Sequence, residues 1–349
     1  QSSDLIDECL FDVKPRKCIS QEAVSKSATK LVPQNSIAIV TRVGVGKLAF
    51  MPFSYATSQD FLSLSGLKTN PEFTVYALYK MMQLVSNEVQ GTSIKGVTKD
   101  ELLAKKIMIP CCNEQKKIGV YLHNLDHLIT LHQRKLEKLQ NMKKSCLQKM
   151  FPKDGATVPE IRFSEFQGDW EERPLGSCFD ERLESLPDGE LLSVTIGSGI
   201  KKFSELDRHD NSNTDKSKYK RVCIGDIAYN SMRMWQGASG RSPYEGIVSP
   251  AYTVVKPIGD IDTQFFAYMF KKKEIIHLFE INSQGLTSDT WNLKYPAFSK
   301  IVVRVPRNVE EQSRIARFLL KLDELISCAE QEIEITKRMK KGCLQKMFV

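Results

Sequence analysis

A six-residue segment, Cys-Leu-Gln-Lys-Met-Phe, occurs twice in this chain, at 146–151 and at 343–348. Nearly half of the positions that the same offset aligns are identical. Among the matched segments are Glu114-Gln115 with Glu311-Gln312, Leu125-Asp126 with Leu322-Asp323, and Met142-Lys143-Lys144 with Met339-Lys340-Lys341. An internal repeat of this kind restricts the possible folds more than any other feature, because both copies must adopt the same local structure.

Each repeat is predicted to form one long helix, over 111–151 and over 307–349. Apolar residues recur at alternating steps of four and three, which is the a/d spacing of a coiled coil. At 1.5 Å per residue, about 36 residues give a helix of roughly 55 Å. We expect two antiparallel helices that hold two similar domains apart about a pseudo-two-fold axis. The predicted seam comprises Ile118, Leu122, Leu125, Ile129 and Leu136, and Ile315, Leu319, Leu322, Ile326 and Ile333.

The segment between the helices, 152–306, is predicted to be a globular α/β domain. Short β-branched and apolar runs separated by turn residues indicate strands near 191–196, 224–229, 247–248, 251–255 and 301–305. One helix is expected over 263–279. The predicted fold class is therefore α/β, with two globular domains separated by the two long helices.

Residues 1–110 resemble a shortened copy of that domain. Ser36-Ile37-Ala38-Ile39 is similar to Asp226-Ile227-Ala228-Tyr229, and 106–110 parallels 301–306. Compared with 152–306, this first domain is short at its front, so its front part is expected to be missing. The chain also starts at Gln1 rather than Met, so we expect the N-terminus to be missing from this sequence. The predicted order is domain, helix, domain, helix.

Charge and composition restrict the possible partners and the location of this protein. The net charge of +8 is compatible with a polyanionic partner. No apolar run approaches the ~18 residues that a membrane span needs, and no signal peptide is visible. The nine cysteines show no paired Cys-x-x-Cys spacing, which favours reduced thiols. We expect a cytoplasmic protein of a bacterium or archaeon, with no membrane partner.

The local chemistry favours double-stranded DNA as that partner. Arg and Gln can make paired hydrogen bonds to base edges, whereas Lys, Ser and Thr mostly bind phosphates. For each residue by itself, a solvated surface charge is the simpler interpretation. The candidate DNA-binding residues are Arg42, Lys47, Lys95, Lys201, Lys202, Lys218, Tyr219, Lys220, Arg221, Arg233, Trp235, Gln236 and Arg241.

Catalytic signatures are absent from the sequence. Val43 to Leu48 resembles the end of a P-loop, but Thr41 occupies the first glycine position and Leu48 replaces the Mg²⁺-binding Ser or Thr. A turn near a DNA-facing loop is the better interpretation. His123, Asp126, His127 and His132 have the wrong spacing for a zinc protease motif, and only Asp323 is kept in the second repeat, so we expect no metal site.

The repeat resembles the specificity (S) subunits of Type I restriction–modification enzymes, over essentially the whole chain. The resemblance is carried by two Glu-Gln-x-x-Ile helix starts, two Leu-x-x-Leu-Asp segments and the paired Cys-Leu-Gln-Lys-Met-Phe ends. Pro159-Glu160-Ile161-Arg162-Phe163 with Gly168-Asp169-Trp170 is similar to the opening of a target-recognition domain in that family.

The resemblance implies that each globular domain recognises one half of a bipartite DNA site. It also implies that the helices act as a spacer and as the docking surface for two methyltransferase (M) subunits, which methylate adenine. Restriction (R) subunits would complete the complex. S-adenosylmethionine, ATP and Mg²⁺ would belong to those partner subunits, and this chain would bind no cofactor and carry no catalysis. The short first domain departs from the family pattern.

Two other hypotheses stay open at this stage. The chain could be the recognition portion of a larger single-chain restriction–methyltransferase enzyme, which methyltransferase motifs upstream of Gln1 would reveal. Alternatively, it could be a coiled-coil scaffold without a DNA role, in which case replacing Arg233, Trp235 and Arg241 by alanine would leave DNA affinity unchanged.

Overall fold

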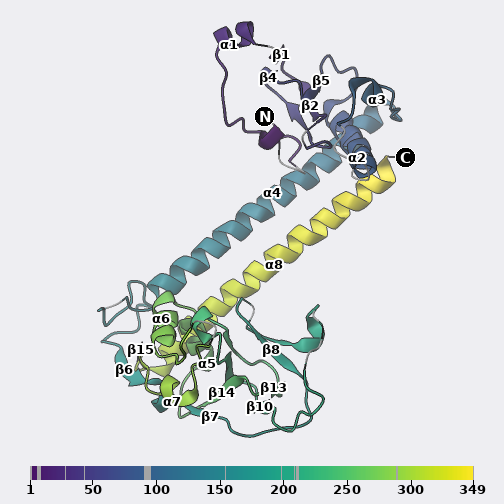
Figure 1. Cartoon of the computed structure of the whole chain (residues 1–349). Coiled ribbons are helices and arrows are strands. Elements are labelled where there is room, and N and C mark those ends of the chain that lie inside the picture. Colours follow the sequence, from purple (N-terminus) through teal and green to yellow (C-terminus); the bar gives the residue numbers. More distant parts are fainter. Residues whose placement is uncertain are drawn as a thin grey trace. The chain divides into compact units, whose positions relative to one another are not determined.

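The computed structural model of the chain divides into two compact units, which are described separately. Unit 1 comprises 1–136 with 328–349, and unit 2 comprises 137–327. The structure describes residues 2–5, 9–27, 29–42, 44–89, 96–153, 155–197, 199–207, 209, 212–287 and 290–348. The boundary falls within both long helices, so each unit contains a globular part and a segment of each helix (Figure 1).

The globular part of unit 1 is a small α/β domain. Its three-stranded antiparallel sheet has the order β3-β2-β5, and β1 pairs with β4 beside it. A long helix, α2, follows the last strand. The elements are η1 (Ser2–Asp4), α1 (Gln21–Lys26), β1 (Lys30–Val32), β2 (Ser36–Val40), β3 (Leu48–Met51), β4 (Tyr55–Thr57), β5 (Phe61–Leu64), α2 (Pro71–Val89) and α3 (Lys99–Leu103).

The core of unit 1 joins the sheet to the helices. Ile37 and Ile39 of β2 are fully buried against Tyr76 of α2. Leu122 and Leu344, from the two long helices, belong to the same cluster. Burial of these apolar side chains is the main term that holds the sheet on the helix pair.

Unit 2 has a larger sheet of four antiparallel strands in the order β12-β11-β14-β7. Three two-stranded pairs surround it: β10-β13, β8-β9 and β15-β6. The elements are β6 (Glu171–Pro174), η2 (Leu175–Ser177), β7 (Phe179–Glu181), β8 (Leu192–Thr195), β9 (Gly199–Lys202), η3 (Phe203–Glu205), β10 (Lys220–Val222), β11 (Ile227–Asn230), η4 (Met234–Gln236), β12 (Ser239–Arg241), β13 (Gly246–Val248), β14 (Tyr252–Pro257), α5 (Thr263–Met269), α6 (Lys273–Ile281), α7 (Tyr295–Phe298) and β15 (Val302–Val305).

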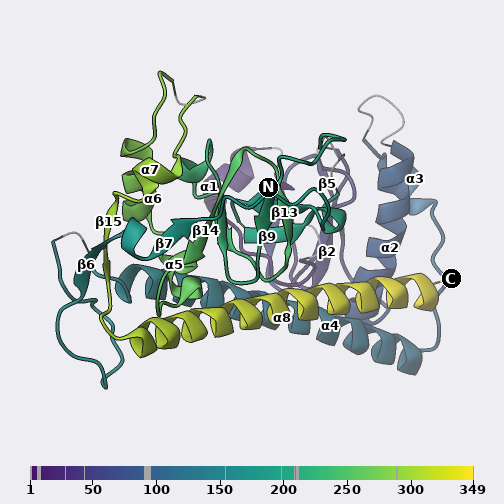
Figure 2. The ribbon, with the colours of Figure 1, turned by 90° about the horizontal axis from the view of Figure 1, so that it is seen from below.

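The core of unit 2 is rich in aromatic side chains. Phe265 and Phe266 of α5 are fully buried, and they share one cluster with Ile315 and Leu319 of the last helix. Figure 2 shows α5 close to the first turns of that helix. Phe179 meets Phe266 edge to face with ring centroids 5.0 Å apart, a preferred geometry for aromatic pairs.

One expected element differs in the structure. The helix predicted over 263–279 is interrupted, because α5 ends at Met269 and α6 begins at Lys273. Lys272 has an extended backbone, with φ −70° and ψ 141°, and its ammonium donates to the carbonyl of Pro152. Contacts of this kind, far apart in sequence, outweigh the helical pattern that predicted one continuous helix.

The two sheets repeat one topology. β2 in the order β3-β2-β5, and β11 in the order β12-β11-β14, are each the central strand of three, and β7 adds a fourth strand in unit 2. Each central strand is followed in sequence by one neighbour (β3 or β12) and then by the other (β5 or β14). Of the two similar segments, residues 36–39 and 227–229 fall on these central strands. The pairing of Lys30 with Thr57 in β1-β4 likewise corresponds to that of Lys220 with Val248 in β10-β13.

Both repeats form single long helices, α4 (Cys112–Lys149) and α8 (Val309–Met347). Within unit 1 their segments run antiparallel, since Asp126 pairs with Lys340 and His132 with Glu332 (Figure 1). Within unit 2 the corresponding pair is Lys143 with Asp323. Of the helices in the described part of the chain, none is long and apolar enough to span a membrane.

Candidate nucleic-acid interface

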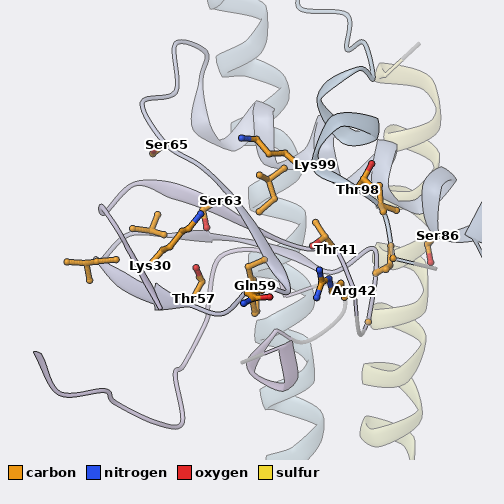
Figure 3. Close-up of a pocket in the computed structure, with 18 of the residues that line it drawn as sticks. Lys30, Thr41, Arg42, Thr57, Gln59, Ser63, Ser65, Ser86, Thr98 and Lys99 are labelled. Carbon is orange, nitrogen blue, oxygen red and sulfur yellow. The ribbon is translucent and has the colours of Figure 1, made fainter. Parts of the chain in front are cut away.

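A broad open hollow of about 1370 Å³ lies in unit 1, where β1, β5, the β2–β3 turn and the start of α3 meet (Figure 3). Three basic residues line it, and no described lining residue is Asp or Glu. Such a surface suits a polyanion, because cations and hydroxyls bind phosphate oxygens. Its polar side chains are Lys30, Arg42, Lys99, Gln59, Thr41, Thr57, Ser63, Ser65, Ser86 and Thr98.

Backbone hydrogen bonds at the end of β2 shape this hollow. Thr41 donates its N–H to the carbonyl of Asp60 and accepts from the N–H of Val97, each at 2.8 Å. A Cβ on Gly96 would lie 2.6 Å from the Thr41 carbonyl oxygen, so only glycine permits this close approach. These contacts bring the segment before α3 next to the strand end that precedes Arg42.

Helix α3 begins at the rim of the hollow with a capping box. The Thr98 hydroxyl accepts from the N–H of Glu101, and the Glu101 carboxylate accepts from the N–H and the hydroxyl of Thr98. These hydrogen bonds lower the pKa of Glu101. The box fixes the first turn of α3, which carries Lys99.

The segment that resembled a P-loop is the β2–β3 turn. Gly44 and Gly46 both have positive φ, of 89° and 103°, conformations that favour glycine. Gly44 and Val45 line the hollow. Arg42 lies at the start of this turn, is exposed and lines the hollow, whereas Lys47 at its end is half-buried and does not line it. Val43 and the predicted residue Lys95 lie outside the described residues.

The corresponding loop of unit 2, between β11 and β12, carries three predicted residues. Arg233 is exposed, while Trp235 and Gln236 in η4 are half-buried. The Trp235 indole N–H donates to the carbonyl of Met232. Its ring meets Trp291 edge to face, with centroids 5.4 Å apart. The loop therefore carries an exposed arginine and one ring of an aromatic pair.

The basic run at 218–221 is divided between surface and interior. Lys218 is exposed, but Tyr219 is only 3% exposed and its hydroxyl accepts from the N–H of Asn213. Lys220 lies 3.4 Å from Glu181, and Arg221 lies 3.3 Å from Glu184. The last two cations are thus partly neutralised by carboxylates, and Tyr219 packs inside the domain.

The remaining predicted DNA-binding residues lie on β9 and β12. Lys201 and Lys202 are half-buried on β9, and the Lys202 ammonium lies 5.3 Å from the ring centroid of Tyr244. Arg241 donates from Nε to the hydroxyl of Thr263, the first residue of α5.

The predicted seam residues lie on the inner side of the helix segments. Leu122, Leu125, Ile129, Ile315, Leu319 and Leu322 are buried, and Ile118, Leu136, Ile326 and Ile333 are half-buried. His132 lies on the same side, with Nδ1 2.9 Å from Glu332. In the described ranges, no group of three His, Cys, Asp or Glu residues could hold a metal ion.

Four residues of these surfaces were not among the predicted DNA-binding residues: Lys30, Gln59, Lys99 and Trp291. Lys30 pairs in β1-β4 as Lys220 pairs in β10-β13, so comparison of the two sheets would have found it. Trp291 gave no signal, because only the fold brings the loop after α6 next to η4.

Comparison with known proteins finds a family model and relatives that are similar to this chain. Residues 13–141 match the family model described as Type I restriction modification DNA specificity domain. The chain is 23% identical over 301 residues to the Type I restriction enzyme MjaVIII specificity subunit of Methanocaldococcus jannaschii, a match that covers 77% of this chain and 67% of that protein. A second match, 30% identical over 120 residues, is to the specificity subunit of a Type I restriction enzyme of Escherichia coli. It covers 32% of this chain and 29% of that protein.

The fold is also similar to a solved structure. The S subunit of the Type I restriction–modification system from M. genitalium matches with a TM-score of 0.59 and 17% identity. The match covers 91% of this chain and 83% of that chain. At this identity the likeness concerns the fold alone.

Proposed function

We propose that the chain is a specificity subunit of the Type I restriction–modification family and that it recognises a bipartite DNA site for partner enzymes, which the matching family model and the relatives support. In this proposal each unit recognises one half-site. The adenine methylation and the DNA cleavage take place on other subunits, and this chain contributes recognition without chemistry of its own.

The observation that carries the proposal is the repetition of one module in two units. The strand order β3-β2-β5 of unit 1 repeats as β12-β11-β14 in unit 2, and each unit has a loop with an exposed arginine after the central strand of the three, at Arg42 in unit 1 and Arg233 in unit 2. Arginine can make paired hydrogen bonds to a guanine edge. Two such modules in one chain suit a target with two specific elements and a gap between them.

We further propose that α4 and α8 set that gap. A continuous helix rises 1.5 Å per residue, and DNA offers equivalent faces about every 34–36 Å. A pair of helices with 38 and 39 residues is long enough to connect two half-sites of this spacing. In this arrangement their apolar seam acts as an antiparallel coiled coil.

The partners proposed for the helix pair are two methyltransferase subunits, which the duplicated surface supports. Unit 1 exposes Tyr121, Leu128 and Met339, and unit 2 exposes their repeat equivalents Phe318, Leu325 and Met142. Each of these six side chains is between 36% and 49% exposed. Tyr121 and Leu128 are seven residues apart on α4, and therefore share one helix face. One apolar set per unit suits one partner per unit.

We assign the cofactors to the partner subunits, because those subunits would carry the chemistry. S-adenosylmethionine would be held by the methyltransferase subunits, and ATP and Mg²⁺ by restriction subunits that join the complex. The proposed location is the bacterial or archaeal cytoplasm, where DNA and these partners occur.

The test is co-expression of the chain with its cognate methyltransferase subunit, followed by mapping of methylated adenines by long-read sequencing. Methylation at a two-part motif with a constant gap is the expected result. A folded chain that forms no complex and directs no methylation would favour the scaffold hypothesis instead. The single-chain alternative would require methyltransferase activity without any added subunit.

A further inference from the structure

In unit 2 the half-buried side chain of Lys271 donates to three backbone carbonyls. The acceptors are Gly237 at 2.6 Å, Ser239 at 2.8 Å and Ile196 at 3.1 Å. They belong to three segments, namely the end of η4, strand β12 and the turn after β8. The lysine itself lies in the break between α5 and α6.

This geometry uses the full bonding capacity of the side chain. An ammonium has three N–H donors and no acceptor, so three carbonyls satisfy it completely. Burying a charge costs free energy unless hydrogen bonds compensate for it. The three bonds therefore constrain the carbonyls, and with them the segments that carry them, around one point.

The constrained segments carry the candidate recognition residues of unit 2. Gly237 directly follows η4, which contains Trp235 and Gln236 and is preceded by Arg233. Ile196 lies in the turn that leads to β9, which carries Lys201 and Lys202. Strands β8 and β9 also contact β12, and the lysine adds a connection from Ile196, in the turn after β8, to Gly237 at the end of η4.

In the part of the chain that the structure describes, this lysine with its three carbonyl acceptors is found in unit 2 and not in unit 1. Tyr76 of α2 and Tyr268 of α5 are equivalent, because each donates to the repeat-related aspartate Asp126 or Asp323. On this alignment the position of Lys271 corresponds to Tyr79, within the uninterrupted helix α2. The break after α5 is therefore the feature that places the lysine within hydrogen-bonding distance of the η4 loop and the turn after β8.

We infer that Lys271 is a positioning residue for DNA recognition by unit 2, holding the η4 loop and the β8–β9 turn in one arrangement. The inference rests on the proposed function. Lys271 touches no DNA in this scheme and acts only through the loops.

Protonation offers a way to test this arrangement without mutation. Burial, together with the nearby ammonium of Lys143, lowers the pKa of Lys271 to about 8. The Lys143 ammonium of α4 acts on it directly. Other charged and titratable groups of the surrounding elements include Asp323 of α8, which pairs with Lys143, Tyr268 of α5, which donates to Asp323, Arg241 of β12 and the adjacent Lys272. A neutral amine keeps two donors for three carbonyls, so one loop contact is lost above that pH.

The first experiment follows tryptophan fluorescence of the full chain between pH 6.5 and pH 9.5, a window chosen to bracket the pKa of about 8. Trp170 is buried in the core, whereas Trp235 lies in η4 and contacts Trp291. The wild-type emission should change with a midpoint near pH 8, and Lys271→Arg, which stays charged, should show no such midpoint. A flat wild-type profile, or an identical transition in both proteins, would overturn the inference.

The second experiment measures specificity in the complex with methyltransferase subunits. Lys271→Met should lower the preference for one half of the two-part motif by about tenfold, leaving the other half unchanged. Lys273→Met is the matched control, because Lys273 is the exposed neighbour in α6, and it should keep both halves. Wild-type preference in Lys271→Met would overturn the positioning role.

Failure of the proposed function is distinguishable from failure of this inference. If the wild-type complex methylates no two-part motif, the proposed function fails, while the fluorescence profile still decides whether Lys271 orders the loop. If Lys271→Met does not fold, wild type and Lys271→Arg are compared for methylation at pH 7 and pH 9. Only the wild type should then lose preference for one half-site at the higher pH.

Discussion

The ammonium of Lys340 lies 2.6 Å from the carboxylate of Asp126, and joins the end of one repeat to the start of the other within unit 1. The second carboxylate oxygen of Asp126 accepts from the hydroxyl of Tyr76 at 2.6 Å. Burial and this carboxylate raise the pKa of Tyr76, which keeps the hydroxyl protonated as a donor. In unit 2 the repeat-related residues Lys143, Asp323 and Tyr268 form the same triad.

The two triads differ in burial, which predicts different mutational costs. The side chains of Lys340 and Asp126 are 7% and 17% exposed, against 27% and 37% for Lys143 and Asp323. Lys340→Met leaves a largely buried carboxylate unpaired and should lower the unfolding free energy by about 3 kcal/mol. Lys143→Met should cost about 1 kcal/mol or less, because water screens its partner. Urea unfolding of both variants measures the difference.

The exchange of charges in the buried triad supplies the control. Asp126→Lys combined with Lys340→Asp should restore part of the stability that either single change removes, since the pair is re-formed with opposite polarity. An equal loss of unfolding free energy in Lys340→Met and Lys143→Met would contradict the role assigned to burial. So would a double variant no more stable than the single variants.

Glu114 and Glu311 are equivalent in the repeat but differ in surroundings, which gives a second matched pair. Glu311 is 1% exposed, accepts from Nε and Nη2 of Arg162 at 2.8 Å each, and accepts from the indole of Trp170. Glu114 is exposed. Glu311→Gln should lower the unfolding free energy by about 2 kcal/mol or more, because it leaves a half-buried guanidinium without its carboxylate.

Glu114→Gln should change the stability by less than about 0.5 kcal/mol, as a surface substitution. Thermal or urea unfolding of the two variants tests both values. A comparable loss in each would mean that the first-repeat glutamate also has a buried partner, contrary to its exposure here.

The periodic parts of this chain were predictable, and the contacts of the loops were not. The long helices follow from apolar residues at steps of four and three, which few other structures accommodate. The central strands followed from Ser36-Ile37-Ala38-Ile39 and its counterpart. Those signals depend on neighbours in sequence, which is why they can be recognised without the fold.

The candidate site was predicted only in part, because its members come from distant segments. Arg42 was named from loop chemistry, and the structure places it in the hollow of unit 1 with Lys30 and Lys99. Tyr219 was chosen for its place in a basic run, yet its side chain is buried and its hydroxyl accepts from the N–H of Asn213, a contact that the run itself does not reveal. The interruption of the helix predicted over 263–279 depends on the contacts of Lys271 and Lys272, which no local pattern encodes.

The unfolding free energy should rise with pH over the range in which Lys271 titrates. DNA recognition by unit 2, which the charged lysine supports, should weaken over the same range. Its pKa in the folded chain is about 8, below the value of ~10.4 expected when unfolded. Between these values the unfolded chain binds more protons, so the unfolding free energy increases by up to about 1.4 kcal/mol per pH unit. Below pH 8 the penalty for the buried charge is fully present.

The measurement is urea unfolding of wild type and Lys271→Met at pH 7, 8.5 and 10. The stability of the wild type relative to the variant should increase from pH 7 to pH 10, because methionine has no proton to release. A difference that is constant with pH would show that the Lys271 pKa is not lowered in the folded chain.

Lys30 and Arg42 should contribute to DNA binding in different ways, although both line the hollow of unit 1. Lys30 is exposed on β1 and is assigned to a phosphate, so Lys30→Met should weaken all DNA sequences alike and reduce the salt slope of the binding constant by about 1. Arg42→Ala should instead cost about 1–3 kcal/mol on the specific site and relax one base position. Binding of the assembled complex to specific and unrelated duplexes, at several NaCl concentrations, separates the two. A uniform loss in Arg42→Ala with unchanged specificity would reassign this arginine to the phosphate backbone, and leave the bases of that half-site to other residues of the hollow.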